Sequence, residues 1–149
     1  MKNLICILGV AFLMVSCNNK DKTDLETATT KNNSKTIEYD LSEEMGSTEG
    51  AGAKADYIDG KIKRCTINIY GEMGQTEIIY VFKNNEIQVA QENQTYSTEG
   101  DSINRQKWQS EKISYTIDYS GLLIKSRADQ EKITNIFEEV HKVIPFDLK

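Results

Sequence analysis

The sequence has very little of the residues from which nucleophilic and metal sites are built. It contains one histidine, three cysteines, one tryptophan and one proline among 149 residues. A serine or cysteine nucleophile usually needs a histidine base beside it, and zinc sites draw on clustered Cys and His. The single histidine, His141, lies near the end of a C-terminal segment of helical periodicity, where a partial positive charge is favourable. The sequence therefore predicts neither a nucleophilic triad nor a metal centre.

The chain also lacks an excess of basic residues. Lys and Arg number 18 against 23 Asp and Glu, which gives a formal net charge of −5. Nucleic-acid binding and electrostatic adhesion to anionic lipid both need clustered Lys and Arg. We therefore expect no nucleic-acid partner, and any membrane attachment has to depend on something other than charge.

A long hydrophobic run occurs at the N-terminus, from Leu4 to Val15, after the basic residue Lys2. The run is too short to span a bilayer as a mature helix. It ends at Ser16 and Cys17, before an abruptly polar stretch. This arrangement resembles the signal peptide and lipobox of bacterial lipoproteins. The other interpretations of residues 1–17 are a retained membrane helix and a buried core helix.

The lipoprotein resemblance implies that residues 1–16 are removed and that Cys17 carries diacylglycerol on its sulfur and an acyl group, such as palmitate, on its new amino group. Several acyl chains hold a protein durably in a membrane, whereas a single chain binds only reversibly. Asn18, in place of an aspartate, implies localisation to the outer membrane, on the periplasmic face. Lys20 and Asp21 leave exposure at the cell surface as the alternative.

Cys65 is the only cysteine left for the folded part, because Cys6 leaves with the signal peptide and Cys17 carries lipid. An intramolecular disulfide is thereby excluded. Cys65 shares the strand parity of Ile67 and Ile69, so we expect a buried and unreactive thiol. The alternative is a cysteine with a redox role or an intermolecular partner.

The mature chain divides into a tether and one domain. Residues 17–35 comprise the lipidated cysteine and a polar stretch that cannot bury enough surface to fold, and residues 36–149 suffice for a single domain. Residues 42–54, with several glycines and glutamates, are expected to form a mobile acidic loop. Alternation with a period of two predicts strands at Thr36–Leu41, Lys61–Tyr70, Thr76–Phe82, Glu86–Tyr96, Lys112–Asp118 and Leu122–Lys125.

Turn residues separate these strands. Asp59-Gly60 and Asn84-Asn85 both favour positive φ at consecutive positions, as tight hairpins require, and Gly71–Gly74 predicts another short turn. Strands joined by short turns form an antiparallel meander. Several segments between residues 49 and 90, including Tyr57–Gly60, Tyr70–Gly74 and Asn84–Ile87, resemble an uncharacterised family of small secreted proteins of Gram-negative bacteria. That resemblance supports the hairpins and implies no activity.

After the last strand the period changes to that of a helix. Ser126 is placed to cap it, with Asp129 three residues on, and Pro145 ends it. The apolar stripe of this helix consists of Ile133, Ile136, Phe137, Val140, Val143 and Ile144. We therefore predict an α+β fold, an antiparallel β-meander of five to six strands with one C-terminal amphipathic helix packed on one face.

Acidic residues could in principle supply a catalytic carboxylate pair, but their pattern is that of solvated strand faces. We therefore predict a lipid-anchored envelope protein that acts as a non-catalytic binding domain without a cofactor: an assembly subunit, an inhibitor or immunity protein, or a sensor, with an envelope protein as partner. The alternative is a lipid-anchored enzyme with dispersed acidic residues. The candidates for such residues are Glu72, Glu77, Glu92, Asp101 and Asp118.

The strand Thr76–Phe82 is apolar on both faces. Because one helix can cover only one face of a sheet, Ile79 and Val81 have two possible environments. They either meet the loop of residues 42–54 or lie open as a small apolar patch, and such patches often mark partner sites. Ile79 and Val81 are therefore the candidate partner surface.

Overall fold

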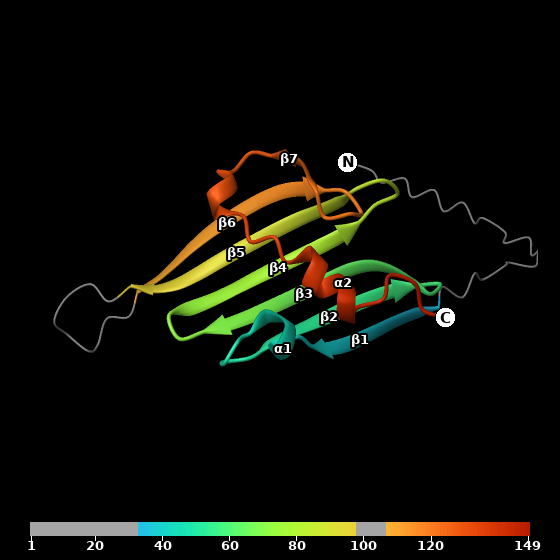
Figure 1. Ribbon diagram of the computed structural model, residues 1–149, viewed down its shortest axis with the longest axis horizontal. Helices are drawn as coiled ribbons and strands as arrows, with labels where there is room; N and C mark the ends of the chain where they lie inside the picture. Colours follow the sequence, from blue (N-terminus) through green and yellow to red (C-terminus); the bar gives the residue numbers. More distant parts are fainter. Residues whose placement is uncertain (1–32, 98–106) are drawn as a thin grey trace, which may run out of the picture. The chain divides into compact units, whose positions relative to one another are not determined.

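The computed structural model describes residues 33–97 and 107–149 of the chain. Within these ranges, seven strands form one antiparallel sheet in which each strand pairs with the next along the sequence (Figure 1). The predicted signal peptide, Cys17 and Asp101 lie outside the described residues. The elements in order are β1 (Ser34–Asp40), α1 (Ser42–Met45), β2 (Ala51–Ile58), β3 (Lys61–Gly71), β4 (Gly74–Phe82), β5 (Ile87–Ser97), β6 (Lys107–Ile117), β7 (Leu123–Ser126), the 3-10 turn η1 (Gln130–Lys132) and α2 (Phe137–Val143).

The predicted antiparallel meander with a C-terminal helix is confirmed, but a count of five to six strands is too low. The missed strand is β2, which begins inside the predicted loop of residues 42–54 and lies between β1 and β3. Its inward side chains are Ala51, Ala53 and Ala55, each no more than 6% exposed. Alanine gives a weak strand signal, but small side chains leave room for the helical turn α1, which packs against β2.

The turn between β2 and β3 forms as predicted. Asp59 and Gly60 have φ values of 51° and 79°, the left-handed conformation that a tight hairpin needs. The prediction of positive φ at Asn84-Asn85 is wrong, because Asp59 is the only described non-glycine residue with a positive φ. The β4–β5 turn is instead closed by a hydrogen bond from the Lys83 N–H to the Glu86 carbonyl at 2.9 Å.

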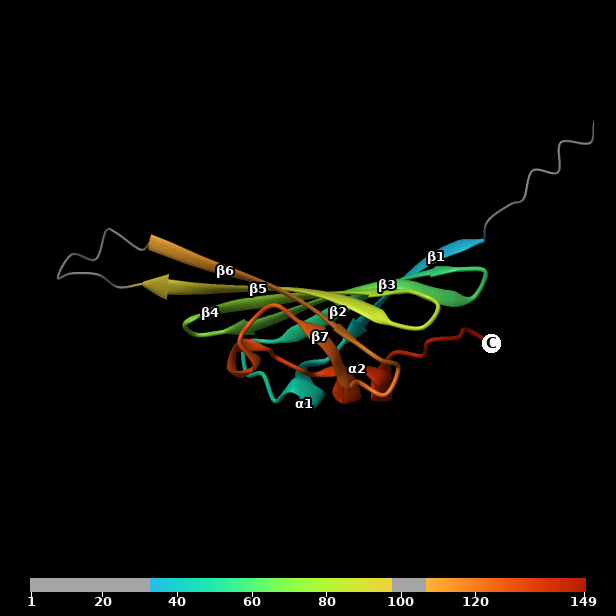
Figure 2. The ribbon, with the colours of Figure 1, turned by 90° about the horizontal axis from the view of Figure 1, so that it is seen from above.

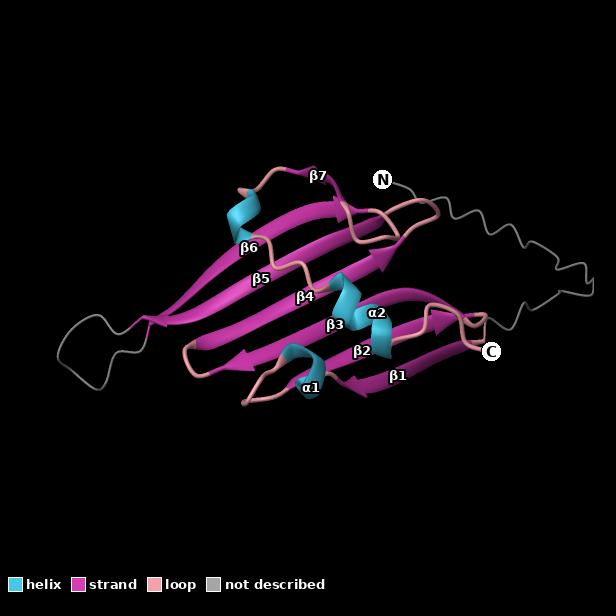
Figure 3. Cartoon of the chain, in the orientation of Figure 1, coloured by secondary structure: helices cyan, strands magenta, loops and turns pink. Residues whose placement is uncertain are grey.

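The helical elements α1, η1 and α2 all lie on the same face of the sheet (Figures 2 and 3). Phe137 of α2 is 2% exposed, and its ring meets Tyr80 edge-on with centroids 5.8 Å apart. Apolar side chains from every second position of β2 to β6 complete the core under these helices. The largest fully buried residues of this core include Tyr57, Tyr80, Leu41, Ile67, Ile78, Ile87, Ile117, Ile144 and Val140.

The C-terminal apolar stripe is buried or partly buried as predicted, but only Phe137–Val143 is an α-helix. Ser126 does not cap it, because the Ser126 hydroxyl bonds to the backbone of Ala128. Residues 133–136 lie outside regular helix. The backbone of Thr134 is held by the sheet instead: its N–H donates to Gln91 Oε1 and its carbonyl accepts from the Tyr115 hydroxyl.

Candidate binding surface on the open sheet face

Ile79 and Val81 lie on the face of the sheet opposite the helices. Their neighbours Ile78 and Tyr80 are fully buried in the core, and successive side chains of a strand point to opposite faces. The loop of residues 42–54 does not cover them, because α1 packs on the core side of the sheet (Figure 2). The sequence predicts that Ile79 and Val81 either meet this loop or lie open, and among the described residues they lie open. Both side chains are half-buried by their neighbours on the sheet.

The strand register determines which residues surround this pair. Side chains directly opposite on neighbouring strands lie about 4.5–5.5 Å apart at Cβ, so each residue of a cross-strand row contacts the next. Two rows cross the open face at Ile79 and Val81. They are Thr66–Ile79–Ala90–Ser114 and Arg64–Val81–Gln88–Thr116–Lys125.

The part of these rows that runs from β4 to β7 lines a shallow groove with a volume of about 430 Å³. Its apolar floor comes from Ile79, Val81 and Ala90. Val89 and Tyr115 also line it, although their side chains are buried in the core, so they contribute backbone. The remaining lining residues are neutral polar or basic: Gln88, Ser114, Thr116, Ser126, Lys125 and Arg127.

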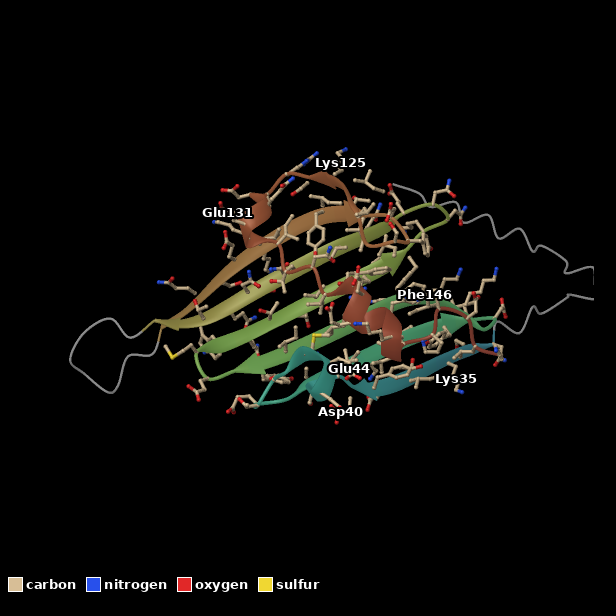
Figure 4. All side chains as sticks on the ribbon, in the orientation of Figure 1. Lys35, Asp40, Glu44, Lys125, Glu131 and Phe146 are labelled. Atoms are coloured by element: carbon tan, nitrogen blue, oxygen red, sulfur yellow. The ribbon has the colours of Figure 1, made fainter. Side chains whose placement is uncertain are left out.

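No carboxylate of the described residues lines this groove, although the chain as a whole is acidic. Lys125 and Arg127 stand at its β7 side, and Figure 4 shows Lys125 at the sheet edge. Neither of them has an ion-pair partner among the described residues, whereas Lys54, Lys112 and Lys132 each pair with a glutamate. The groove therefore combines an apolar floor with two positive charges that form no ion pair with the described residues.

The four candidate carboxylates within the described residues do not converge on the groove. Glu77 and Glu92 are directly opposite each other on β4 and β5, but neither lines the groove. Glu92 accepts hydrogen bonds from Ser110 Oγ at 2.6 Å and Gln94 Nε2 at 3.2 Å and pairs with Lys112 at 3.3 Å. These partners, Ser110 first, hold the pKa of Glu92 below its usual value.

The other two described candidates occupy turns. Glu72 is exposed between β3 and β4. The Asp118 carboxylate accepts hydrogen bonds from Ser120 Oγ at 2.6 Å and from the Leu122 N–H at 3.0 Å, and these bonds lower its pKa. A carboxylate with a lowered pKa is ionised at neutral pH and is poorly suited to donate a proton.

Two further properties of the described residues bear on function. No group of three or more His, Cys, Asp or Glu residues within 33–97 and 107–149 is placed to hold a metal ion. Over the same ranges, no helix is both long enough and apolar enough to cross a membrane.

Cys65 lies in the core with no exposed surface, so its predicted burial is confirmed, and it has no disulfide partner among the described residues. Desolvation by burial, with a smaller effect of the Asp56 charge, raises the pKa of the thiol to about 12. The reactive form of cysteine is the thiolate. We therefore still predict that the Cys65 thiol reacts slowly, because little of it is in the thiolate form at neutral pH.

Sequence reasoning missed one buried polar residue, Gln91, which is 1% exposed on the core side of β5. Its Nε2 donates to the Lys132 carbonyl at 3.1 Å, and its Oε1 accepts from the Thr134 N–H at 2.9 Å. The signal was present, because Gln91 continues the inward parity of Ile87 and Val89 and a buried amide must find partners. It links the segment before α2 to the sheet.

Comparison of the chain with models of protein families, with curated proteins and with solved structures finds no match.

Proposed function

We propose that this chain is a lipid-anchored protein of the bacterial cell envelope that acts as a non-catalytic binding domain. Acyl chains on Cys17 attach it to the outer membrane, with the domain on the periplasmic face or at the cell surface. Its partner is another envelope protein, and the role is that of an assembly subunit, an inhibitor or immunity protein, or a sensor.

The observation that carries the binding role is the groove around Ile79 and Val81. All the described helices lie on one face of the seven-stranded sheet, which leaves the other face without helical cover in the described part of the chain. Apolar positions on such a face favour contact with a partner over solvation. Lys125 and Arg127, which form no ion pair with the described residues, lie beside an apolar floor and are complementary to a segment that carries both carboxylates and apolar side chains. The partner segment is therefore acidic and partly apolar.

A photocrosslinking amino acid at Gln88 tests this proposal, because Gln88 is an exposed groove residue. The matched control carries the same amino acid at Glu72, which is exposed in the β3–β4 turn. Illumination of intact membranes should join an envelope protein to position 88 and not to position 72, and mass spectrometry of the joined peptide should identify an acidic segment. Equal crosslinking from both positions, or a basic captured segment, contradicts the proposal.

Charge reversal gives an independent control for the same experiment. Lys125→Glu with Arg127→Glu should abolish crosslinking at position 88, whereas Lys61→Glu with Lys63→Glu, at exposed lysines outside the groove, should leave it intact. Added salt should weaken capture by the native groove, because exposed charges are screened within about 10 Å at 0.1 M salt.

The alternative, an enzyme with dispersed acidic residues, is favoured by one observation, the direct opposition of Glu77 and Glu92. The binding role is preferred because a general acid needs a raised pKa, whereas that of Glu92 is lowered. An enzyme would convert its substrate, so the peptide joined to position 88 would include a covalently altered form of the partner, and Glu77→Gln would prevent that alteration. The mass of the captured partner therefore distinguishes the two functions.

A further inference from the structure

The turn and edge strand that follow β6 expose the densest group of large apolar side chains on the described surface. We call residues 119–124 the hairpin tip. Tyr119, Leu122, Leu123 and Ile124 are 42, 68, 36 and 55% exposed, and Leu122 is the most exposed large apolar residue described. Scattered exposed apolar residues are ordinary, but four within six consecutive residues are a local concentration of exposed apolar side chains, and such concentrations often mark interaction surfaces.

The hairpin tip is held rigid before any partner arrives. The Asp118 carboxylate accepts from the Ser120 N–H at 2.8 Å, from Ser120 Oγ at 2.6 Å and from the Leu122 N–H at 3.0 Å. The Tyr119 hydroxyl donates to the Lys83 carbonyl of the neighbouring turn at 2.6 Å. Binding therefore orders few new groups, which lowers its entropic cost.

The hairpin tip lies at the end of the sheet where the described chain begins. Ser34 pairs with Ile58, next to the β2–β3 turn, and in a meander every second turn lies at the same end. The β4–β5 turn and the hairpin tip therefore share the end of Ser34, whereas the β3–β4 turn with Met73 lies at the opposite end (Figure 1). Only 17 residue steps separate Ser34 from Cys17, which span at most roughly 60 Å.

The chemistry of the tip matches the lipid–water interface. Leucine and isoleucine side chains enter the acyl boundary, tyrosine is enriched at headgroup level, and lysines beside them extend to the phosphates. Lys83, whose carbonyl accepts the hydrogen bond of the Tyr119 hydroxyl, is exposed and supplies such a charge.

We propose that the hairpin tip contacts the lipid surface to which the chain is anchored, with Leu122 and Ile124 inserted as far as the boundary between the headgroups and the acyl chains. This contact rests on the lipid anchor of the proposed function and adds to it a fixed orientation: the Ser34 end of the sheet faces the membrane, and the β3–β4 turn points away from it.

Cysteine labelling tests the contact on the lipidated protein. Cys65 has no exposed surface and Cys17 is acylated, so Leu122→Cys supplies the accessible thiol for an environment-sensitive fluorophore. The matched control is Met73→Cys, because Met73 is 62% exposed at the opposite end of the sheet. Both proteins are reconstituted in vesicles of phosphatidylethanolamine and phosphatidylglycerol, with and without lipids brominated on their acyl chains.

The fluorophore at position 122 should be quenched by the brominated lipids and should emit at shorter wavelength, whereas the fluorophore at position 73 should do neither. Ile124→Cys should repeat the result of Leu122→Cys if that variant folds poorly. Equal quenching of the fluorophores at positions 122 and 73 would overturn the proposal. Energy transfer between labelled copies of the protein without quenching by lipid would overturn it as well, because the hairpin tip would then contact a second copy of the chain. If neither protein associates with vesicles, the anchor itself is refuted, and the contact that rests on it is refuted as well.

Discussion

Gln91 and Thr134 exchange hydrogen bonds on the core side of the sheet: the Thr134 N–H donates to Gln91 Oε1 at 2.9 Å, and Gln91 Nε2 donates to Thr134 Oγ1 at 3.2 Å. This exchange attaches the segment before α2 to β5. It also explains why the helix begins only at Phe137, because the backbone of Thr134 is committed to the sheet and not to a helical turn.

Replacing Gln91 with leucine should therefore lower the free energy of unfolding by about 1–3 kcal/mol, the usual cost of leaving a buried polar group without a partner. Urea denaturation measures the change. Gln88→Leu, on the same strand but exposed on the open face, is the matched control and should alter stability by less than about 0.5 kcal/mol. Equal effects of the two changes would contradict the role assigned to Gln91.

Two buried tyrosines should respond oppositely to loss of their hydroxyl groups. The Tyr80 hydroxyl is buried and has no hydrogen-bond partner among the described residues, so Tyr80→Phe should leave stability unchanged or raise it. The Tyr57 hydroxyl donates to the Pro145 carbonyl at 2.8 Å and lies 3.1 Å from the Tyr39 hydroxyl. Tyr57→Phe should therefore lower the free energy of unfolding by about 1 kcal/mol. Thermal unfolding should give a lower melting temperature for Tyr57→Phe than for Tyr80→Phe, and the reverse order would contradict these assignments.

The buried Cys65 thiol should make the protein less stable in alkali. Its pKa is raised to about 12 in the folded chain, whereas an unfolded cysteine ionises near pH 8.5. The unfolded state therefore loses its proton first, and the free energy of unfolding falls as pH rises from about 8.5 towards 12. Urea titrations at pH 7 and pH 10 should show a smaller fall in the free energy of unfolding for Cys65→Val than for the native chain. Rapid maleimide labelling of the native thiol at neutral pH would refute its burial.

Lipid attachment should depend on Cys17, because acylation uses its sulfur and cleavage of the signal peptide follows acylation. Cys17→Ser should yield an unlabelled precursor of full length when cells are grown with radioactive palmitate, whereas the native chain yields a labelled and shorter product. A Cys17→Ser protein that still matures to the normal size would identify an ordinary secreted protein.

The sequence predicts the fold wherever apolar and polar residues alternate strongly, as from Ile113 to Ile117. It misses β2 because Ala51, Ala53 and Ala55 are as small as loop residues, and their burial depends on α1 folding back over them. The α2 helix is overpredicted for a similar reason: the stripe that begins at Ile133 is buried or partly buried, but contacts with β5 and β6 determine its backbone conformation. Long-range packing determines the structure at both places.

The candidate site is predictable only in part. Ile79 and Val81 stand out because their strand is apolar on both faces, whichever strands it pairs with. Lys125 and Arg127 do not stand out, because their position beside the groove depends on the pairing of β7 with β6, where the register shifts between Thr116 and Ile117. Because β7 has only four residues and its register shifts, the sequence does not indicate on which face of the sheet Lys125 lies.

The binding role is tested most directly by replacing Ile79 and Val81 together with threonine, which keeps strand propensity and removes most of the apolar floor of the groove. Ile58→Thr, at an apolar side chain that is 38% exposed and does not line the groove, is the control. The measurement is photocrosslinking from position 88 in intact membranes, with the melting temperature recorded for each variant. The double variant should remain folded and lose the crosslinked partner, while Ile58→Thr retains it. An unchanged crosslinked partner, with or without a lower melting temperature, would contradict the assignment of the open face as the binding surface.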